Sequence, residues 1–304
     1  MTKHVAVLMG GWSAEREVSL VSGRECAAAL RKKGYGVSEI DVGRDIAAVL
    51  AQTKPDVVFN ALHGQFGEDG RIQGLLDIMG IPYTHSGMLA SALAMDKVVA
   101  KRLFTAAGIS CPEGRTISKE ELLKGDPLPR PYVVKPINEG SSVGVAIIRQ
   151  GDNTRPFDIS WPYADEVMVE PFIPGRELTV AVMGDRSLCV TELQPKTGFY
   201  DYSAKYEEGQ TLHLCPAILP ENISRRVLQM AFAAHQVLGC RGVSRSDFRY
   251  DDTQGHSPEK IMLLEVNTQP GMTPLSLVPE QARYCGISFP DLVSWMVESA
   301  TCDA

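Results

Sequence analysis

The sequence predicts an α/β protein with more than one domain. Apolar stretches of strand length alternate with helical patterns over residues 4–87, and such alternation is typical of a parallel sheet wound right-handed. Beyond residue 130, short runs rich in β-branched residues follow one another around tight turns, as in antiparallel hairpins. The length of 304 residues suggests two domains, or three small ones.

The N-terminal elements alternate between short apolar runs and longer runs with helical spacing. In a parallel sheet ligands gather at the carboxyl ends of strands, and Gly10, Gly11, His63 and Gly64 lie at such ends. The expected strands are 4–11, 36–42, 56–64 and the short extended piece 81–87, and the expected helices are 13–34, 45–55 and 70–80.

The remaining elements indicate a different architecture. A helix over 88–108 leads into a second domain, and the proline-rich stretch 124–131 is typical of a loop. After it we expect strands at 132–136, 144–149 and 166–172, a hairpin over 177–194 that turns at Gly184 and Asp185, a helix at 224–239, strands at 242–252 and 260–267, and a closing helix at 289–300.

Composition places the chain among ordinary globular proteins, with 44% hydrophobic and 22% charged residues. The net charge of −7 argues against a nucleic-acid partner. Seven cysteines without a C-x-x-C pair are typical of reduced thiols in a cytosolic protein. No apolar run reaches the roughly 18 residues of a membrane helix, and the first one is too short for a signal sequence. We therefore expect a cytoplasmic protein with no membrane partner.

Two strand-like stretches, "RSDFR" and "LLEVN", carry an oxygen-rich set of side chains. Alternation along a strand puts Arg245 and Asp247 on one face, and Glu265 and Asn267 on one face. If the strands pair antiparallel, the two carboxylates and the amide can converge, and oxygen ligands suit Mg²⁺. The alternative is the solvated face of a hairpin, but the apolar flanks favour the metal site.

The stretch "VVKPINEGSSVGV" at 133–145 runs from an apolar strand through Lys135 into a loop of small residues. Backbone N–H groups in such a loop can form a nest for an anion, and the lysine adds a positive charge. The Walker pattern is absent from the chain. A plain hairpin loop explains the same residues, so the phosphate interpretation depends on the oxygen cluster described above.

Four further stretches are candidates for a site. His63 follows a strand, although a lone histidine is more often structural. Glu15 stands near a helix start, where an acid can simply complement the helix dipole. The aromatic, non-periodic segment 195–209 is interpreted as a lid over a ligand. The stretch 267–279 offers backbone donors at Gly271 and near Ser276 for an oxyanion or carboxylate.

Seven stretches in one order span nearly the whole chain: "GGWSAEREVSLVSG", "HGQFGEDG", "YTHSGMLASALAMDK", "VVKPINEGSSVGV", "PFIPGRELTVAVMG", "FYDYSAKY" and "LLEVNTQPGMTPLSLVP". With them the chain resembles the D-alanine–D-alanine ligases of the ATP-grasp superfamily. The resemblance implies an α/β ATP-grasp fold, in which an N-terminal parallel α/β domain (1–96) precedes two α+β lobes (97–176 and 177–304) that enclose ATP.

The resemblance also implies which residues bind ATP and metal. Asp247, Glu265 and Asn267 match the ligands of two Mg²⁺ ions, with Mn²⁺ as a possible substitute. The residues that match ATP contacts are the phosphate-binding Lys97, Lys135 and Lys205, the loop residues Ser141, Ser142 and Val143, the adenine hinge at Glu170 and Ile173, and the ribose acid Glu177.

Substrate and catalytic roles follow from the same resemblance. Glu15, Ser141 and Tyr206 match a hydrogen-bonded triad that holds the lid, and we expect them to be catalytic together with Arg245 and Gly271. The residues that match D-alanine contacts are Glu15 for the ammonium of the first molecule, Arg245 and Gly271 for the acyl oxygen, Ser276 and Leu277 for the carboxylate of the second molecule, Lys205 for the phosphate and substrate, and His63 in the active site.

The implied reaction joins two D-alanine molecules through a D-alanyl phosphate, with release of ADP and phosphate, for peptidoglycan precursor synthesis. The family is commonly dimeric, so we expect a homodimer. Two alternatives stay open: an ATP-grasp ligase for another amino or hydroxy acid, and a non-catalytic nucleotide-binding module. Tyr206 argues against D-lactate as the second substrate, because the relatives that use lactate carry another residue there. The absence of G-x-G-x-x-G argues against a dinucleotide-binding oxidoreductase.

Overall fold

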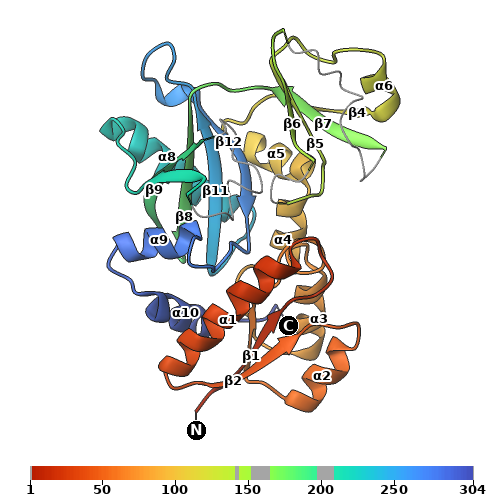
Figure 1. Ribbon diagram of the computed structural model, residues 1–304, viewed down its shortest axis with the longest axis vertical. Coiled ribbons are helices and arrows are strands. Elements are labelled where there is room, and N and C mark those ends of the chain that lie inside the picture. The colour runs from red at the N-terminus through yellow and green to blue at the C-terminus, as the bar shows by residue number, and fades with distance from the viewer. Residues whose placement is uncertain (1, 141–143, 152–164, 197–208, 304) are drawn as a thin grey trace.

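The computed structural model describes residues 2–140, 144–151, 165–196 and 209–303. It contains three sheets, with the N-terminal domain at one end and two further lobes at the other (Figure 1). The strands of the first sheet, in the order β2-β1-β3, are β1 (His4–Met9), β2 (Gly36–Asp41) and β3 (Val57–Asn60), and both pairings are parallel. This confirms the predicted parallel sheet.

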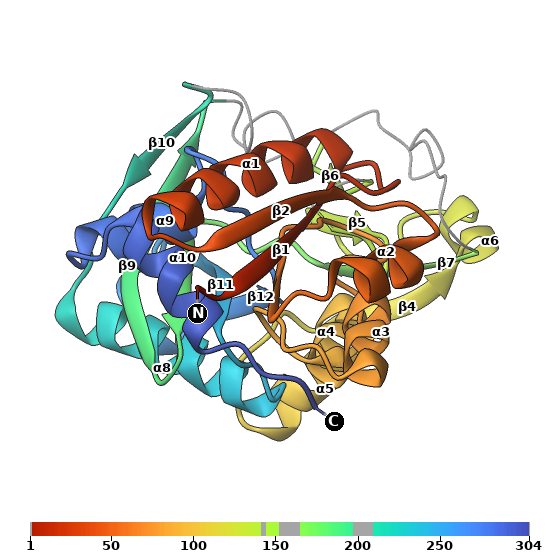
Figure 2. The same cartoon turned by 90° about the horizontal axis from the view of Figure 1, so that it is seen from below.

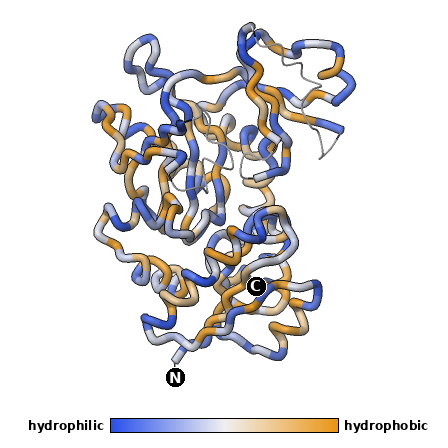
Figure 3. The backbone as a smooth tube through the Cα atoms, viewed as in Figure 1, coloured by the Kyte–Doolittle hydropathy of each residue, from blue (hydrophilic) through white to orange (hydrophobic). Residues whose placement is uncertain are grey.

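Alternation along β1 explains how this sheet acquires two buried faces. Val5 and Val7 pack against α1 (Arg16–Lys32), whereas Ala6 and Leu8 pack against the other side, where α2 (Ile46–Thr53) and α3 (Arg71–Met79) lie. Burial on both faces requires a continuous apolar strand, and Figure 3 shows hydrophobic residues along the strands of this domain.

The last residues of the chain complete the N-terminal domain. The helix α10 (Phe289–Glu298) packs beside α1, and its Leu292 and Val293 join the same core as Val5 (Figure 2). Thr301 then pairs antiparallel with Tyr83, which itself pairs with Val58 of β3. The N-terminal domain is therefore built from both ends of the chain.

The segment predicted as one helix over 88–108 is two helices, so this prediction was wrong. Helix α4 (Met88–Met95) ends at Asp96, whose backbone is extended, and α5 (Lys97–Ala106) begins directly after it. The Asp96 carboxylate accepts hydrogen bonds from the N–H groups of Val98 and Val99, both at 3.0 Å. An aspartate that caps new N–H groups stabilises a fresh helix start, which explains the break.

The central lobe holds an antiparallel sheet in the order β4-β7-β5-β6. Its expected strands are β5 (Tyr132–Lys135), β6 (Ala146–Ile148) and β7 (Glu166–Pro171), each slightly shorter than or close to its predicted range. The edge strand β4 (Arg115–Ser118) and the short helix α6 (Lys119–Leu123) were missed. Both are short, so they carry little periodicity.

The C-terminal lobe holds an antiparallel sheet in the order β10-β9-β8-β11-β12. The predicted hairpin is confirmed, with β8 (Arg176–Met183) and β9 (Arg186–Pro195) joined by two residues. Helix α8 (Glu221–Val237) covers one face of the sheet, and α9 (Leu277–Tyr284) packs against β8 and β9. The other elements are β10 (Thr211–Leu214), which was missed, β11 (Val243–Tyr250), the 3₁₀ turn η2 (Pro258–Lys260) and β12 (Ile261–Asn267).

Each predicted domain range thus contains one sheet, apart from Arg176 at the start of β8. In the described ranges, no helix is long and apolar enough to cross a membrane.

Candidate active site

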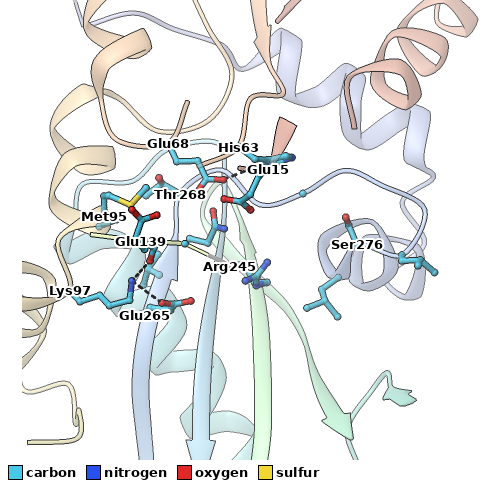
Figure 4. Close-up of a pocket in the computed structure, with 17 residues that line it drawn as sticks. Glu15, His63, Glu68, Met95, Lys97, Glu139, Arg245, Glu265, Thr268 and Ser276 are labelled. Atoms are coloured by element: carbon cyan, nitrogen blue, oxygen red, sulfur yellow. Dashed lines mark hydrogen bonds and ion pairs between the residues drawn. The ribbon is translucent and has the colours of Figure 1, made fainter. Parts of the chain in front are cut away.

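A pocket lies where the N-terminal domain meets the start of α5 and the C-terminal sheet (Figure 4). Residues from segments far apart in the sequence line it, and nine of the residues singled out from the sequence are among them. They are Glu15, His63, Lys97, Arg245, Glu265, Asn267, Gly271, Ser276 and Leu277. The carboxyl ends of β1 and β3 supply the first two, as expected for a parallel sheet.

His63 is held by hydrogen bonds on both ring nitrogens. Its Nε2 lies 3.0 Å from the Ser22 hydroxyl, and its Nδ1 lies 3.1 Å from a carboxylate oxygen of Glu68. Burial raises the pKa of Glu68, and repulsion from Glu15 adds to this, although the bond to His63 acts in the opposite direction. The imidazole therefore has a fixed orientation at the rim of the pocket.

Glu15 precedes α1 at the N-cap position, but its side chain makes no capping hydrogen bond. The side chain is 6% exposed and points into the pocket (Figure 4). The carboxylate approaches Gly64 so closely that a Cβ added there would lie 2.8 Å from Oε2. A role limited to the helix dipole does not explain this placement, which instead suits an acid that meets a ligand.

The strands of the predicted metal set pair antiparallel, with Asp247 opposite Glu265 and Arg245 opposite Asn267. The antiparallel pairing on which the predicted metal set depends is therefore present, but Asp247 does not line the pocket with Glu265 and Asn267. Asp247 accepts two hydrogen bonds from Arg245, at 2.9 and 2.7 Å, and a third from the Thr179 hydroxyl at 2.7 Å. Within the described residues, no group of three or more histidine, cysteine, aspartate or glutamate side chains is arranged for a metal.

Lys97, the first residue of α5, brings a positive charge to this oxygen set. Its Nζ lies 3.7 Å from Oε2 of Glu265 and donates a 2.5 Å hydrogen bond to the carbonyl oxygen of Glu139. The lysine is 8% exposed, so solvent screens its charge weakly. It therefore links the loop that enters the glycine-rich stretch to the metal strand.

The turn after β12 places a glycine against a helix start. A Cβ on Gly271 would come within 2.9 Å of the Ser276 hydroxyl oxygen, so a side chain there is disfavoured. That hydroxyl accepts a 2.9 Å hydrogen bond from the N–H of Thr273. Ser276 is the N-cap of α9 and Leu277 its first residue, and N–H groups in a first helical turn suit a carboxylate.

Buried amides hold the two loops of the pocket together. Gln269 is 1% exposed, and its side-chain amide donates to the carbonyl of Leu62, next to His63. Its Oε1 accepts a 2.6 Å hydrogen bond from the Asn60 amide. The segment after the metal strand is therefore fixed to the end of β3.

Between α5 and the central sheet, a carboxylate is enclosed by two lysines. Glu170 of β7 pairs with Lys135 of β5 at 2.5 Å and with Lys101 of α5, and all three side chains are less than a tenth exposed. Burial raises the pKa of Glu170, but the two lysines outweigh it and bring the pKa below the ordinary value. This cluster does not line the pocket, so the structure does not bring Lys135 and Glu170 together with the pocket residues named above.

The other predicted nucleotide residues lie beside Arg249. Its Nε donates to the carbonyl of Ile173 at 3.0 Å, and its guanidinium lies 3.4 Å from Glu177. Arg249 therefore ties the connection between β7 and β8 to strand β11.

Five predicted residues lie outside the described ranges, together with most of the proposed lid at 195–209. They are Ser141, Ser142, Val143, Lys205 and Tyr206.

The sequence analysis missed several residues of this region, among them Glu68, Glu139 and Lys101. Glu68 and Glu139 line the pocket, and Lys101 pairs with Glu170. Helical spacing could have found Lys101, because it lies four residues after Lys97 and so shares its face of the helix. Glu68 and Glu139 lie in loops, where no periodicity indicates the direction of a side chain.

Comparison with known protein families gives two matches. The family described as "D-ala D-ala ligase C-terminus" matches residues 103–298, and "D-ala D-ala ligase N-terminus" matches residues 45–86.

Curated relatives match along the whole chain. A D-alanine–D-alanine ligase from Acidiphilium cryptum is 60% identical, covering 99% of each chain. One from Paramagnetospirillum magneticum is 58% identical, covering 100% of each chain.

Solved structures show the same fold. The crystal structure of a D-alanine–D-alanine ligase from Bacillus anthracis superposes with a TM-score of 0.82 at 32% identity, covering 98% of this chain and 97% of that one. A structure of the Bacillus anthracis enzyme complexed with ATP gives a TM-score of 0.81 at 30% identity over the same shares.

Proposed function

The chain belongs to the D-alanine–D-alanine ligase family, and we propose that it uses ATP to join two D-alanine molecules for a peptidoglycan precursor. The predicted family resemblance and ATP-grasp fold class are confirmed. The observation that carries the proposed activity is that an acid, a lysine, an arginine, two residues with oxygen ligands suited to a metal, and a helix start line the same pocket.

The residues of the oxygen set fit Mg²⁺, with Mn²⁺ as an alternative. Asp247, Glu265 and Asn267 offer carboxylate and amide oxygens from two paired strands, which are the donors this ion prefers. Their carboxylates lie against Lys97 and Arg245, so their charge is offset without the ion. When bound, Mg²⁺ neutralises the phosphate oxygens of ATP.

In the first step, the carboxylate of one D-alanine attacks the γ-phosphate of ATP, and the products are D-alanyl phosphate and ADP. This chain's residues contribute positioning and charge, which is the main requirement of phosphoryl transfer. Glu15 receives the ammonium of that D-alanine, and Lys97 supplies positive charge beside the phosphates. His63, oriented by Ser22 and Glu68, lies beside the same substrate.

In the second step, the amine of the other D-alanine attacks the acyl carbon, and phosphate leaves from a tetrahedral intermediate. Arg245 and the N–H of Gly271 stabilise the oxyanion that develops there. The second carboxylate is held by the Ser276 hydroxyl and the N–H of Leu277 at the start of α9. A closed lid would keep water from the acyl phosphate.

ATP extends from this pocket toward the buried lysines. We assign the phosphates to Lys97 and Lys135, adenine to Glu170 and the backbone of Ile173, and ribose to Glu177. The remaining assignments are Ser141, Ser142 and Val143 for the phosphate loop, Lys205 for the transferred phosphate, and the triad of Glu15, Ser141 and Tyr206 that holds the lid.

The deciding experiment is an ADP-release assay with Mg²⁺ over a panel of D- and L-amino acids and D-lactate. The expected result is ADP formation that depends on D-alanine, with one dipeptide formed per ADP by mass spectrometry. ADP formation without a joined product, or equal activity with L-alanine, contradicts the proposal.

Three further features complete the proposal. We assign the domains to the ranges 1–96, 97–176 and 177–304, with α10 and Thr301 of the last range packing on the first domain. A cytoplasmic location is supported by the seven free thiols.

A homodimer is supported by exposed apolar side chains on the contacting helices α3 and α4, namely Ile78, Met88 and Leu89. Light scattering coupled to size-exclusion chromatography tests this oligomeric state.

A further inference from the structure

Three of the seven thiols gather on the C-terminal lobe, on residues that do not line the pocket. Cys189 lies in the middle of β9, Cys215 directly follows β10, and Cys285 caps the C-terminal end of α9. The sulfur atoms of Cys189 and Cys215 are 3.6 Å apart. Cys285 also interacts with the Cys189 thiol. Strand β10 pairs with β9, and α9 packs against β9; all three elements are labelled in Figure 2.

The sheet holds the two closest sulfur atoms in place. Strand β10 pairs antiparallel with β9, with Leu214 opposite Glu192. Beyond β10, the N–H of Ala217 donates a 2.7 Å hydrogen bond to the carbonyl of Val190. Backbone bonds therefore fix Cys215 against β9 on both sides, with Cys189 as its neighbour. A disulfide has an S–S distance of about 2.05 Å, so side-chain rotation has to shorten the present distance by roughly 1.5 Å.

The two thiols differ in exposure and in acidity. Cys189 is buried and Cys215 is half-buried, so a small oxidant reaches Cys215 more easily. The hydrogen bond between them lowers the pKa of Cys215 and raises the pKa of Cys189. Since a thiolate is the reactive form of cysteine, Cys215 is the group that reacts first.

We propose that Cys215 and Cys189 are a peroxide-sensitive thiol pair that forms a reversible disulfide between β9 and the end of β10. The Cys215 thiolate attacks one oxygen of hydrogen peroxide, which gives a sulfenic acid and releases hydroxide. The Cys189 sulfur then attacks the Cys215 sulfur, the S–O bond breaks and water leaves. Two thiols are oxidised and one peroxide is reduced. A cellular dithiol reverses the bond by exchange, and transient disulfides of this kind are the usual ones in a reducing compartment.

The test uses the full-length, fully reduced protein, treated with hydrogen peroxide near stoichiometry. Free thiols are then blocked with N-ethylmaleimide, and peptides are mapped by mass spectrometry without reduction. The expected result is a peptide pair joined through Cys189 and Cys215 that disappears with dithiothreitol. It should form at least about tenfold faster than oxidation of the half-buried Cys302, which serves as an internal reference.

Variants separate the roles of the three thiols. In Cys189→Ser, the sulfenic acid at Cys215 should persist and react with dimedone. Cys215→Ser should abolish the rapid oxidation, whereas Cys285→Ser should keep the Cys189–Cys215 bond and is the matched control. A bond between Cys189 and Cys285 in the parent protein, or oxidation of Cys302 before any cross-link appears, overturns the proposal. Both of these contradicting outcomes are measured on the parent protein, so the proposal can be overturned even if a variant fails to fold.

Discussion

Charged side chains are arranged differently in the two parts of the proposed site, the substrate pocket and the buried cluster around Glu170. In the substrate pocket, Glu15 and Glu265 face space that a ligand can fill. In the buried cluster of the central lobe, one carboxylate oxygen of Glu170 pairs with Lys101 and the other with Lys135, and all three side chains are buried.

This difference distinguishes residues that we expect to contact the reacting groups from residues that we expect to stabilise the folded structure around ATP. Charged side chains in the pocket line the space that the substrate would fill, so their loss should reduce turnover with little effect on folding. Charges in the buried cluster compensate one another, so their loss should first reduce stability or ATP affinity.

The largest effect should come from Glu265→Gln in the pocket. We expect turnover to fall by roughly 10³-fold or more, because a neutral amide cannot replace the carboxylate charge that would hold the Mg²⁺. ADP release at saturating Mg²⁺ measures it, with the exposed Glu259→Gln as the control. Near-parental ADP release would show that Glu265 is not a metal ligand. A large drop in melting temperature would show that Glu265 stabilises the fold instead.

Glu170→Gln tests the buried cluster. We expect the free energy of unfolding at pH 7 to drop by about 3–5 kcal/mol, because two buried lysines lose their partner. The surface change Glu120→Gln should have an effect within about 0.5 kcal/mol. Urea unfolding measures both.

The pH dependence of this loss has a definite sign. The pKa of Glu170 is lowered in the folded state, so its stabilisation is present above the ordinary value of 4.5 and disappears as pH falls through the folded pKa. The stability difference between the parent and Glu170→Gln should therefore shrink below pH 4.5. A difference that stays constant down to pH 3 contradicts this account of the cluster.

Lys101→Met separates ATP binding from turnover. Lys101 holds the carboxylate that we assign to adenine, so its removal should raise KM for ATP about tenfold and change kcat by less than about threefold. The neighbouring exposed Arg102→Met should leave both constants near the parental values. A fall in kcat alone places Lys101 among the groups that serve the reacting atoms.

Gln269→Leu should give the smallest effect. Loss of its buried amide bonds to Leu62 and Asn60 should loosen the loops that carry His63 and Gly271, and lower kcat/KM for D-alanine about threefold to tenfold. The exposed Gln236→Leu is the control. Unchanged kinetics shows that the pocket loops keep their positions without this bridge.

Sequence reasoning was strongest where a repeating pattern points in one direction. Alternation in "RSDFR" and "LLEVN" predicted the convergence of Asp247 and Glu265, and the observed register places them opposite each other. The strand–helix alternation likewise predicted the parallel sheet, and with it the position of His63 at a strand end.

The rest depends on contacts that no local pattern records. Asp96 looked like one polar residue in a continuous helix, and its capping bonds make it the start of a second helix. Glu170 was assigned from resemblance, and its enclosure by Lys101 could not be predicted because the two residues are 69 positions apart. The buried Gln269 side chain forms its hydrogen bonds with Asn60 and Leu62, which lie more than 200 residues earlier in the sequence.

The return of the chain end to the first domain has a consequence for synthesis on the ribosome. Leu292 and Val293 fill the same core as Val5, and Thr301 pairs with Tyr83. The first domain to leave the exit tunnel therefore stays incomplete until α10 and Thr301 have been synthesised, with one apolar face of its sheet only partly covered. Nascent chains of this protein should consequently need protection from aggregation until α10 has left the tunnel, and a stop codon before α10 should be far more harmful than the short length of that helix suggests.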